Sequence, residues 1–514
     1  MADHHRLINV PAWFAAILSV ILIFHFAQFL DRAYPALVDD HDIIAPLGSS
    51  ATAPAADVLE DLRQTDDFQS FATIGKAERF RPFHYPFKSL QIYLFGDNFR
   101  LWYIAAFAIY VATATMLFTL VYRRFGLVIG LLFSALYFGH PAWSDIMPRL
   151  GPVEIDCILI GTIAIYFCWR WITEGRPILL ALAIVAALTY ATTKEPSSVF
   201  LIAIGGLLAT CGALLANRRM AIVGAVCIPC GAVVLLLLVK TTPTATDGII
   251  PLTLPLKSYL RHWHHDRTAW ITIALLVALA IAAIQKARNT LEVDGRELIA
   301  MLLATLSIEA MRFMIYYLTH AATYAGENDA ISIRYGYPIF VVTSLVAAIV
   351  LGRLSHLPNR PAAQRTLRFA VACTIAMLLV NQGLLARKTL ASRDSWQAFN
   401  TSTEQTIQAI ANWLTTQRKA GQEPRLIVTG PLLEWEPRLS LIMFLRHRMP
   451  DTPVYFDPDE PSQKRAIYHR ESIRYGGTPL PEPPDPASCL DVHVDTDPYQ
   501  SKLCSASMAI IKPF

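Results

Sequence analysis

Two adjacent carboxylates stand just past the first apolar segment. Asp39 and Asp40 are followed by His41 and Asp42, so three carboxylates fall within four residues. One of them, at a membrane surface, could act as a general base toward a sugar or protein hydroxyl, while a neighbour orients it or binds a divalent cation. The alternative is an acidic turn in a solvated loop, and the residues alone favour neither interpretation.

A group of cations follows in the same segment. Arg79, Arg81, His84 and Lys88 are interspersed with six aromatic side chains between residues 79 and 98. This composition is typical of a helix that lies in the membrane interface. Such cations could stabilise charge on a departing lipid phosphate. Snorkelling of the side chains to lipid headgroups is the commoner explanation and stays open.

Further ionisable residues stand at the ends of later apolar segments. They are His140, Asp145, Arg149 and Glu154, then Lys194 and Glu195, and finally Arg334 with Tyr335. Ionisable groups at membrane depth usually face a cavity or a partner. The structural alternatives are a salt bridge among Asp145, Arg149 and Glu154, and an adjacent ion pair of Lys194 with Glu195. The residues Glu309 and Arg312 are spaced to pair on one helical face.

The elements that must position these residues are membrane helices. Of the 514 residues, 54% are hydrophobic and only 16% are charged, whereas soluble chains carry about 25% charged residues. Stretches that could supply the roughly 20 apolar residues of a membrane helix begin near Pro11, Leu101, Phe125, Ile155, Ile178, Phe200, Ala221, Ala269, Leu298, Tyr337 and Phe369. The sequence therefore predicts an all-α polytopic membrane protein with about eleven transmembrane helices. A net charge of only +4 without a basic stripe argues against nucleic-acid binding.

Basic residues in alternate short loops predict the orientation. The loops that are rich in Lys and Arg contain Arg123 and Arg124; Arg170 and Arg176; Arg218 and Arg219; Lys286, Arg288 and Arg296; and Arg353, Arg360, Arg365 and Arg368. We expect these loops to be cytoplasmic, with a cytoplasmic N-terminus and a retained first helix. An odd helix count places the C-terminal segment outside, in the periplasm if the protein lies in a bacterial inner membrane.

The chain divides into two predicted modules. Residues 1–386 form the membrane module, with a first external loop at 31–98, and residues 387–514 form a small extracytoplasmic α/β domain. Helical periodicity at 402–419 and 434–448 alternates with β-type runs at 425–429 and 454–456. The C-terminal cysteines, Cys489 and Cys504, would form a disulfide outside the cell. A cluster of His262, His264, His265 and Asp266 matches no strong metal-ligand spacing, so a metal site there is a minor alternative.

Taken in order, these motifs resemble the GT-C superfamily of polyprenyl-phosphate-sugar-dependent glycosyltransferases. The likeness is greatest to the protein O-mannosyltransferases and to the tetratricopeptide-bearing transmembrane O-mannosyltransferases. The matching elements are Asp39-Asp40, Arg81-Pro82, Leu94-Phe95-Gly96-Asp97-Asn98, His140-Pro141 with Asp145 and Arg149, Lys194-Glu195 and Arg334-Tyr335. The likeness covers about residues 8–350. The His41-Asp42 continuation, the lack of a tetratricopeptide array and the C-terminal segment depart from those families.

The resemblance implies a sugar donor on a polyprenyl phosphate. Asp39 or Asp40 would deprotonate an acceptor hydroxyl on a glycan, a lipid or a protein, and the sugar would be transferred with inversion. The residues implied for binding the donor phosphate are Arg81, His84, Lys88, Lys194, Arg334 and Tyr335. The residues implied in support are Asp42, His140, Asp145, Arg149, Glu154 and Glu195. Members of the superfamily differ in whether they need a divalent metal, which leaves a divalent cation open.

Two other functions compete with this interpretation. O-antigen ligases and oligosaccharide polymerases also combine many helices with a large external loop, typically late in the chain, whereas here the large loop comes first. A flippase for lipid-linked sugars would not be an enzyme. Transporters usually show internal repeats and polar groups at interrupted helices near the middle of the membrane. The sequence shows no such repeat.

Overall fold

The structure of the chain is a computed structural model. It describes residues 4–31, 33–35, 40–64, 81–140, 142–151, 153–241, 256, 259–260, 268–288, 291, 293–322, 337–357, 361–421, 425–429, 435–452, 454–456, 489–493 and 510–513.

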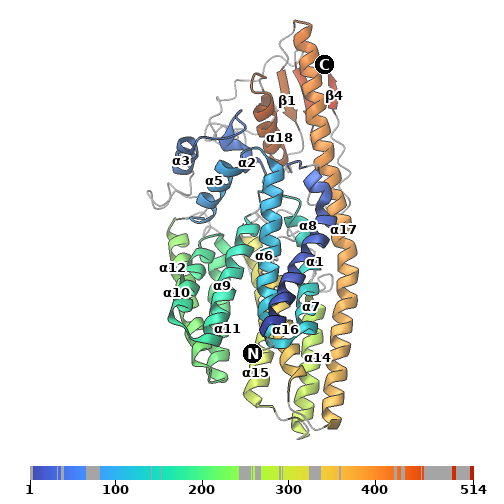
Figure 1. Cartoon of the computed structure of the whole chain (residues 1–514). Coiled ribbons are helices and arrows are strands. Elements are labelled where there is room, and N and C mark those ends of the chain that lie inside the picture. The colour runs from blue at the N-terminus through green and yellow to red at the C-terminus, as the bar shows by residue number, and fades with distance from the viewer. Residues whose placement is uncertain are drawn as a thin grey trace.

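Apolar helices make up most of the described chain and pack side by side as a bundle (Figure 1). Seven of them are long and apolar enough to cross a membrane, so the protein is a helical membrane protein. They are α6 (Phe99–Phe125), α9 (Glu154–Glu174), α11 (Glu195–Leu214), α12 (Arg218–Thr241), α14 (Thr268–Ala287), α15 (Gly295–Ala322) and α16 (Tyr337–Ser355).

Shorter apolar stretches account for the remaining segments predicted to span the membrane. They lie in α1 (His4–Asp31), α7 (Leu127–Phe138), α10 (Pro177–Ala191) and α17 (Pro361–Lys419). Within the described side chains these apolar stretches are Val10–Ile23, Leu127–Phe138, Pro177–Ala191 and Val371–Val380. Each is shorter than the roughly 20 residues of a full crossing, whereas the helices α1 and α17 themselves have 28 and 59 residues. The number of about eleven crossings therefore stays a prediction.

The basic ends of the helices meet at one end of the bundle. Arg219, at the start of α12, donates to the backbone carbonyl of Thr173 near the end of α9, 3.2 Å away. Arg353, at the end of α16, pairs with Glu297 at the start of α15 at 2.5 Å. Gly175 ends α9 in the left-handed conformation, which a glycine adopts without steric cost. The Lys- and Arg-rich turns of the sequence are thus neighbours in space.

The opposite end of the bundle carries short helices. These are α2 (His41–Ile44), a 3₁₀ turn η1 (Ala45–Leu47), α3 (Ala55–Gln64), α5 (His84–Phe95) and α8 (Trp143–Ile146). In α5 the side chains of His84 and Lys88 are buried, whereas Leu90, Tyr93 and Leu94 are about half exposed. A helix with its polar side inward and its apolar side outward suits contact with lipid better than contact with water.

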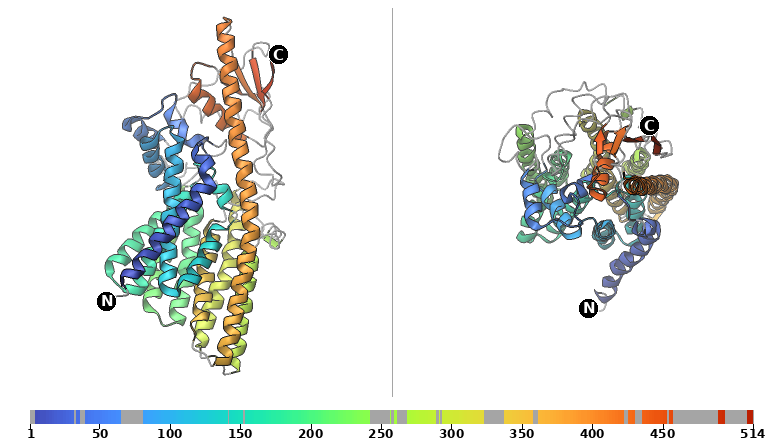
Figure 2. Two further views of the ribbon diagram at one scale, coloured as in Figure 1. Left: turned by 45° about the vertical axis from the view of Figure 1, so that its right-hand side comes forward. Right: turned by 90° about the horizontal axis from the view of Figure 1, so that it is seen from above.

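Helix α17 joins the bundle to the C-terminal segment as one continuous helix of 59 residues. The domain boundary predicted between residues 386 and 387 lies inside it. Beyond it come β1 (Arg425–Thr429), α18 (Trp435–Arg448), β2 (Val454–Phe456), β3 (Cys489–His493) and β4 (Ile510–Pro513). Strand β1 pairs in parallel with β2 and β3, and β3 pairs antiparallel with β4. Figure 2 shows α17 at the side of the bundle, with the strands over one end. That these elements form a separate extracytoplasmic domain stays a prediction.

Gly96 fixes how the first external loop meets α6. Its φ of +53° lies in the left-handed region, and a Cβ there would stand 2.1 Å from the carbonyl oxygen of Ala51. The neighbouring amide of Asp97 donates to that same oxygen at 3.0 Å, and the side chain of Asn98 caps α6 by accepting from the amide of Leu101. The Leu-Phe-Gly-Asp-Asn motif therefore has a structural use in this chain.

We expect Gly96→Ala to lower the free energy of unfolding by about 1–3 kcal/mol, because it combines backbone strain with a clash against Ala51. Gly206→Ala in α11 is the matched control, since no atom lies within 4 Å of its added Cβ. Thermal unfolding of the purified protein measures both. An equal loss of stability in Gly96→Ala and Gly206→Ala would contradict the role given to Gly96.

Candidate active site

Buried ionisable side chains gather around the short helices α2, α5 and α8 and at the starts of α9 and α11. In the described part of the chain they are the carboxylates Asp40, Glu154 and Asp156, the cations Lys88, Arg149 and Lys194, and His84, each at most 7% exposed. Three carboxylates and three cations are thus buried in the same region, so their formal charges balance. Because a buried charge without compensation costs several kcal/mol, such a balance is what a stable arrangement requires.

Asp40 joins the first external loop to the bundle. It directly precedes α2, is fully buried, and its Oδ1 accepts hydrogen bonds from the backbone amides of Leu150 and Gly151, each at 2.7 Å. Bonds from backbone amides to a carboxylate are charge-assisted and stronger than neutral ones. They attach the beginning of the first external loop, residues 40–50, to the short segment between α8 and α9. We call residues 40–50 the acidic loop.

That same segment is held from two other sides. Lys88 of α5 donates from Nζ to the carbonyl of Leu150 at 2.6 Å and lies 4.7 Å from the ring centroid of Trp102. Tyr103 of α6 donates its hydroxyl to the carbonyl of Pro148 at 2.9 Å. Residues 148–151 are therefore a backbone hub on which loop, interfacial helix and bundle converge.

Lys194 and Glu195 do not form the adjacent ion pair that their sequence suggests. Lys194 pairs with Glu154 of α9, and Glu195 accepts two bonds from Arg81, at 2.9 and 3.1 Å. The reason is the backbone, because Lys194 is the extended N-cap residue of α11 while Glu195 already begins the helix. The two side chains therefore leave the chain in different directions. Glu154 therefore has a salt-bridge partner on another helix, Lys194 at the start of α11.

His84 and Asp156 form a second buried pair. Nδ1 of His84 lies 2.6 Å from Oδ2 of Asp156 at the start of α9. Burial lowers the pKa of His84, the carboxylate of Asp156 offsets this only in part, and the charges of Arg81 and Lys88 lower the pKa further. Asp156 lies in the first turn of the apolar helix α9. Its partner lies 72 residues away, so the pair itself could not be predicted.

His140 has contacts of a different kind. Its ring stacks on Phe340 of α16 with centroids 5.0 Å apart, and its Nδ1 accepts from the amide of Ala142. These contacts order the turn between α7 and α8. The supporting role of His140 in the charged cluster stays a prediction.

Several predicted site residues lie outside the described residues. Asp39, Arg334, Tyr335 and Cys504 do so entirely, and the side chains of Asp42, Asp145 and Cys489 do so as well. The disulfide and the contributions of these residues stay predictions, as does the histidine cluster at 262–266. The ranges that the structure covers hold no group of three or more His, Cys, Asp or Glu side chains suited to a metal ion.

A second polar cluster lies between α14 and α15. Arg312 pairs with Glu309 at 3.1 Å, which confirms the spacing argument. Glu309 also accepts from Tyr259 at 2.6 Å and from Thr272 at 2.8 Å. No local sequence pattern points to these two hydroxyl partners, because they come from other segments. The cluster satisfies the carboxylate internally, as a buried charge requires.

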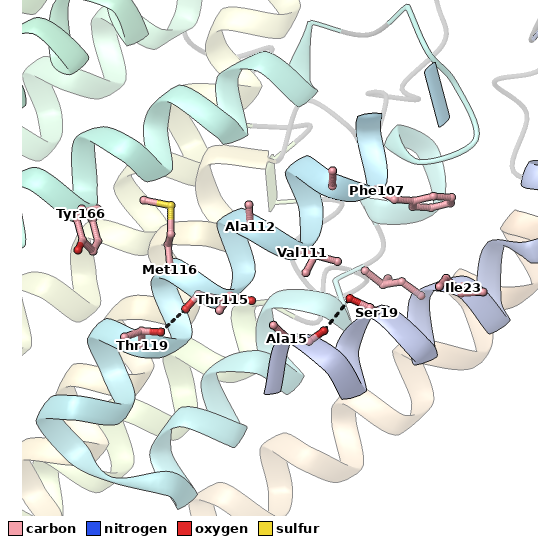
Figure 3. A pocket seen from close by; sticks show the side chains of 12 residues that line it. Ala15, Ser19, Ile23, Phe107, Val111, Ala112, Thr115, Met116, Thr119 and Tyr166 are labelled. Carbon is pink, nitrogen blue, oxygen red and sulfur yellow. Dashed lines mark hydrogen bonds between the residues drawn. The ribbon is translucent and has the colours of Figure 1, made fainter. Parts of the chain in front are cut away.

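An apolar groove of about 850 Å³ runs between α1 and α6, with Tyr166 of α9 at one side (Figure 3). Its hydroxyl groups are partly used within their own helices, since Ser19 donates to the carbonyl of Ala15 and Thr119 to that of Thr115. Among the described residues that line it, none is charged. The groove suits hydrocarbon, and none of the buried charged residues lines it.

Comparison of the sequence with protein-family models gives no match, and comparison with curated proteins gives none. Functional inference for this chain therefore rests on its own residues and their contacts.

We expect Lys194→Met to lower the free energy of unfolding by about 3–5 kcal/mol, because it leaves Glu154 buried without its lysine. The double variant Glu154→Gln with Lys194→Met should recover much of that loss. The more exposed pair of Arg448 with Glu404, whose side chains are 36% and 15% exposed, provides the control, where Arg448→Met should cost under about 1 kcal/mol. Chemical unfolding measures all three, and a Lys194→Met loss no larger than the control would contradict a buried pair.

The lowered pKa of His84 makes the stability of the fold depend on pH. Its folded-state pKa is below its ordinary value of 6.5, so unfolding takes up a proton as the pH falls below that value. The residue therefore stabilises the fold above pH 6.5 and loses this contribution at lower pH. We expect His84→Asn to flatten the dependence of melting temperature on pH below 6.5. An identical slope in the wild type and the variant would contradict the assignment.

Proposed function

We propose that the chain is a membrane glycosyltransferase that moves a sugar from a polyprenyl-phosphate donor to an acceptor hydroxyl. One observation carries the proposal: motif residues from three distant segments converge on one end of the bundle. Asp40 and Lys88 bond to the same backbone hub, while Arg81 and Lys194 take carboxylate partners beside it. Buried ionisable groups that assemble in this way at membrane depth are more often functional than structural.

The contacts of Asp40 support a division of labour within the acidic pair. Its Oδ1 holds two backbone amides and its side chain is fully buried. An oxygen that already accepts two backbone hydrogen bonds is less available to take a proton from an acceptor hydroxyl. Asp39 then serves as the general base, and Asp40 as the neighbour that fixes the position of the loop.

In the proposed reaction the acceptor oxygen attacks the anomeric carbon of the donor sugar. Its proton passes to the carboxylate of the base, and the bond from the anomeric carbon to the phosphate oxygen breaks with its electron pair on that oxygen. Attack opposite the leaving group inverts the configuration. The charge that develops on the phosphate requires nearby cations, which is the main electrostatic demand of the reaction.

Arg81, Lys88 and His84 meet that demand. Arg81 already bonds to Glu195, and Lys88 to the carbonyl of Leu150. A phosphate that binds there would interact with these cations in addition to their partners in the protein. Both cations lower the pKa of His84. A phosphate beside them would offset this effect, and His84 would then take up a proton and add positive charge where the leaving group departs.

The proposal includes an orientation. About eleven crossings place the N-terminus in the cytoplasm of a bacterial cell, and the charged cluster at the periplasmic face of its inner membrane. The gathering of Lys- and Arg-rich turns at the other end of the bundle supports this. The elements after α17 would then form the periplasmic α/β domain. A lipid-borne sugar requires a site at the membrane surface, and the acceptor is a glycan, a lipid or a protein.

We expect Asp39→Asn to lower sugar transfer about 10²–10⁴-fold without changing the melting temperature, because it removes the general base. Asp40→Asn should lower the melting temperature and retain measurable transfer. The measurement is radiolabelled sugar transferred from polyprenyl-phosphate sugars by the purified full-length proteins.

The reverse ranking, in which Asp40→Asn abolishes transfer with its folding intact, would make Asp40 the base. Equal activity in all three proteins would remove the acidic pair from the mechanism. Transfer only of a preassembled glycan would move the protein to the ligase or polymerase class.

A further inference from the structure

Helix α18 lies against the acidic loop from the side opposite the membrane bundle (Figure 1). Leu441, Ile442 and Leu445 are at most 1% exposed. They belong to the same apolar core as Ile43 and Ile44 of α2. Burial of several such side chains stabilises the contact between α18 and α2. The C-terminal segment therefore extends the core over the loop.

An aromatic contact joins α18 to the start of α6. The ring of Phe444 meets that of Phe99 edge to face, with centroids 6.3 Å apart. Phe99 follows Asn98, the residue that caps α6. The helix thus touches both ends of the described loop, α2 near its beginning and α6 at its end.

His447 bridges two loop segments with its two ring nitrogens. Nδ1 donates to the carbonyl of Gly48 at 2.6 Å, and Nε2 lies 3.5 Å from Oδ2 of Asp97. Gly48 directly follows η1, and Asp97 is itself bonded through its amide to Ala51. One side chain from α18 therefore ties together the turn after α2 and the strained junction at Gly96.

The position of Asp40 depends on the segment that α18 holds. The carbonyl of Asp40 accepts the amide of Ile43 at 3.1 Å at the start of α2, and Ile43 is completely buried in the shared core. On its other side, the carboxylate of Asp40 bonds to the hub at Leu150 and Gly151. The acidic loop is thus held between the bundle and α18.

We infer that α18 is a clamp that sets the position of the acidic loop, and that His447 is a positioning residue for transfer. The inference rests on the proposed function for its effect on turnover, while the clamp itself rests on the contacts alone. Loss of the His447 contacts leaves the core of the bundle intact and loosens residues 43–50. A loosened base costs turnover steeply, since a misplacement of about 1 Å can cost about a hundredfold.

The test compares the full-length wild type with His447→Ala, His447→Gln and the control His356→Ala. Glutamine keeps an N–H donor on a side chain of similar length. His356 bonds to Gly352 within the Lys- and Arg-rich end of the bundle, so its loss should leave the loop untouched. The readouts are amide hydrogen exchange of residues 43–50 and the kcat and KM of sugar transfer.

We expect His447→Ala to speed exchange in residues 43–50 by about tenfold and to lower kcat by about ten- to a hundredfold with little change in KM for the donor. His447→Gln should restore much of both. Unchanged exchange in His447→Ala would overturn the clamp, and faster exchange with unchanged kcat would overturn the positioning role. A wild type that transfers sugar from no donor would overturn the proposed function, while the exchange rates would still decide whether α18 holds the loop.

Discussion

Compensation of buried charge is the constraint on which the polar end of this protein depends. A charge moved out of water costs several kcal/mol unless a partner and further hydrogen bonds offset the loss. Three carboxylates and three cations are buried together there, and the partners come from segments that lie far apart in the chain. Each pair therefore fixes the relative position of two elements, as Lys194 with Glu154 fixes α11 against α9. The same pairs that hold the fold also gather the residues that could perform chemistry.

The backbone hub at residues 148–151 turns this constraint into a defined geometry. Backbone groups cannot move independently of the chain, so side chains bonded to them are held more tightly than side chains bonded to one another. Asp40, Lys88 and Tyr103 all form hydrogen bonds to this hub. On the side away from the bundle, α18 packs against α2 in the acidic loop. A site that must bring a base, an acceptor and a charged leaving group together benefits from such rigid positioning.

Periodicity and composition predicted the elements better than their partners. The β-type runs at 425–429 and 454–456 have the bounds of β1 and β2. Short apolar runs bounded by turn residues favour β-strands, because they are too short for a helix. The composition change near 386 does not interrupt α17, since a helix can pass from lipid to water while its residues keep helical propensity. Pairings such as His84 with Asp156 or His447 with Gly48 follow from tertiary packing, which no local pattern encodes. The adjacent Lys194 and Glu195 show the same limit, because backbone conformation decides where each side chain points.

The most direct test of the central claim is to reconstitute the purified protein in vesicles that contain radiolabelled polyprenyl-phosphate sugars, with candidate acceptors supplied on the side of the charged cluster. The measurement follows both the label in the acceptor and the distribution of the labelled lipid between leaflets. The account predicts label in an acceptor, release of polyprenyl phosphate and inverted anomeric configuration. Movement of the intact lipid between leaflets without transfer to any acceptor would contradict it and would identify the protein as a flippase.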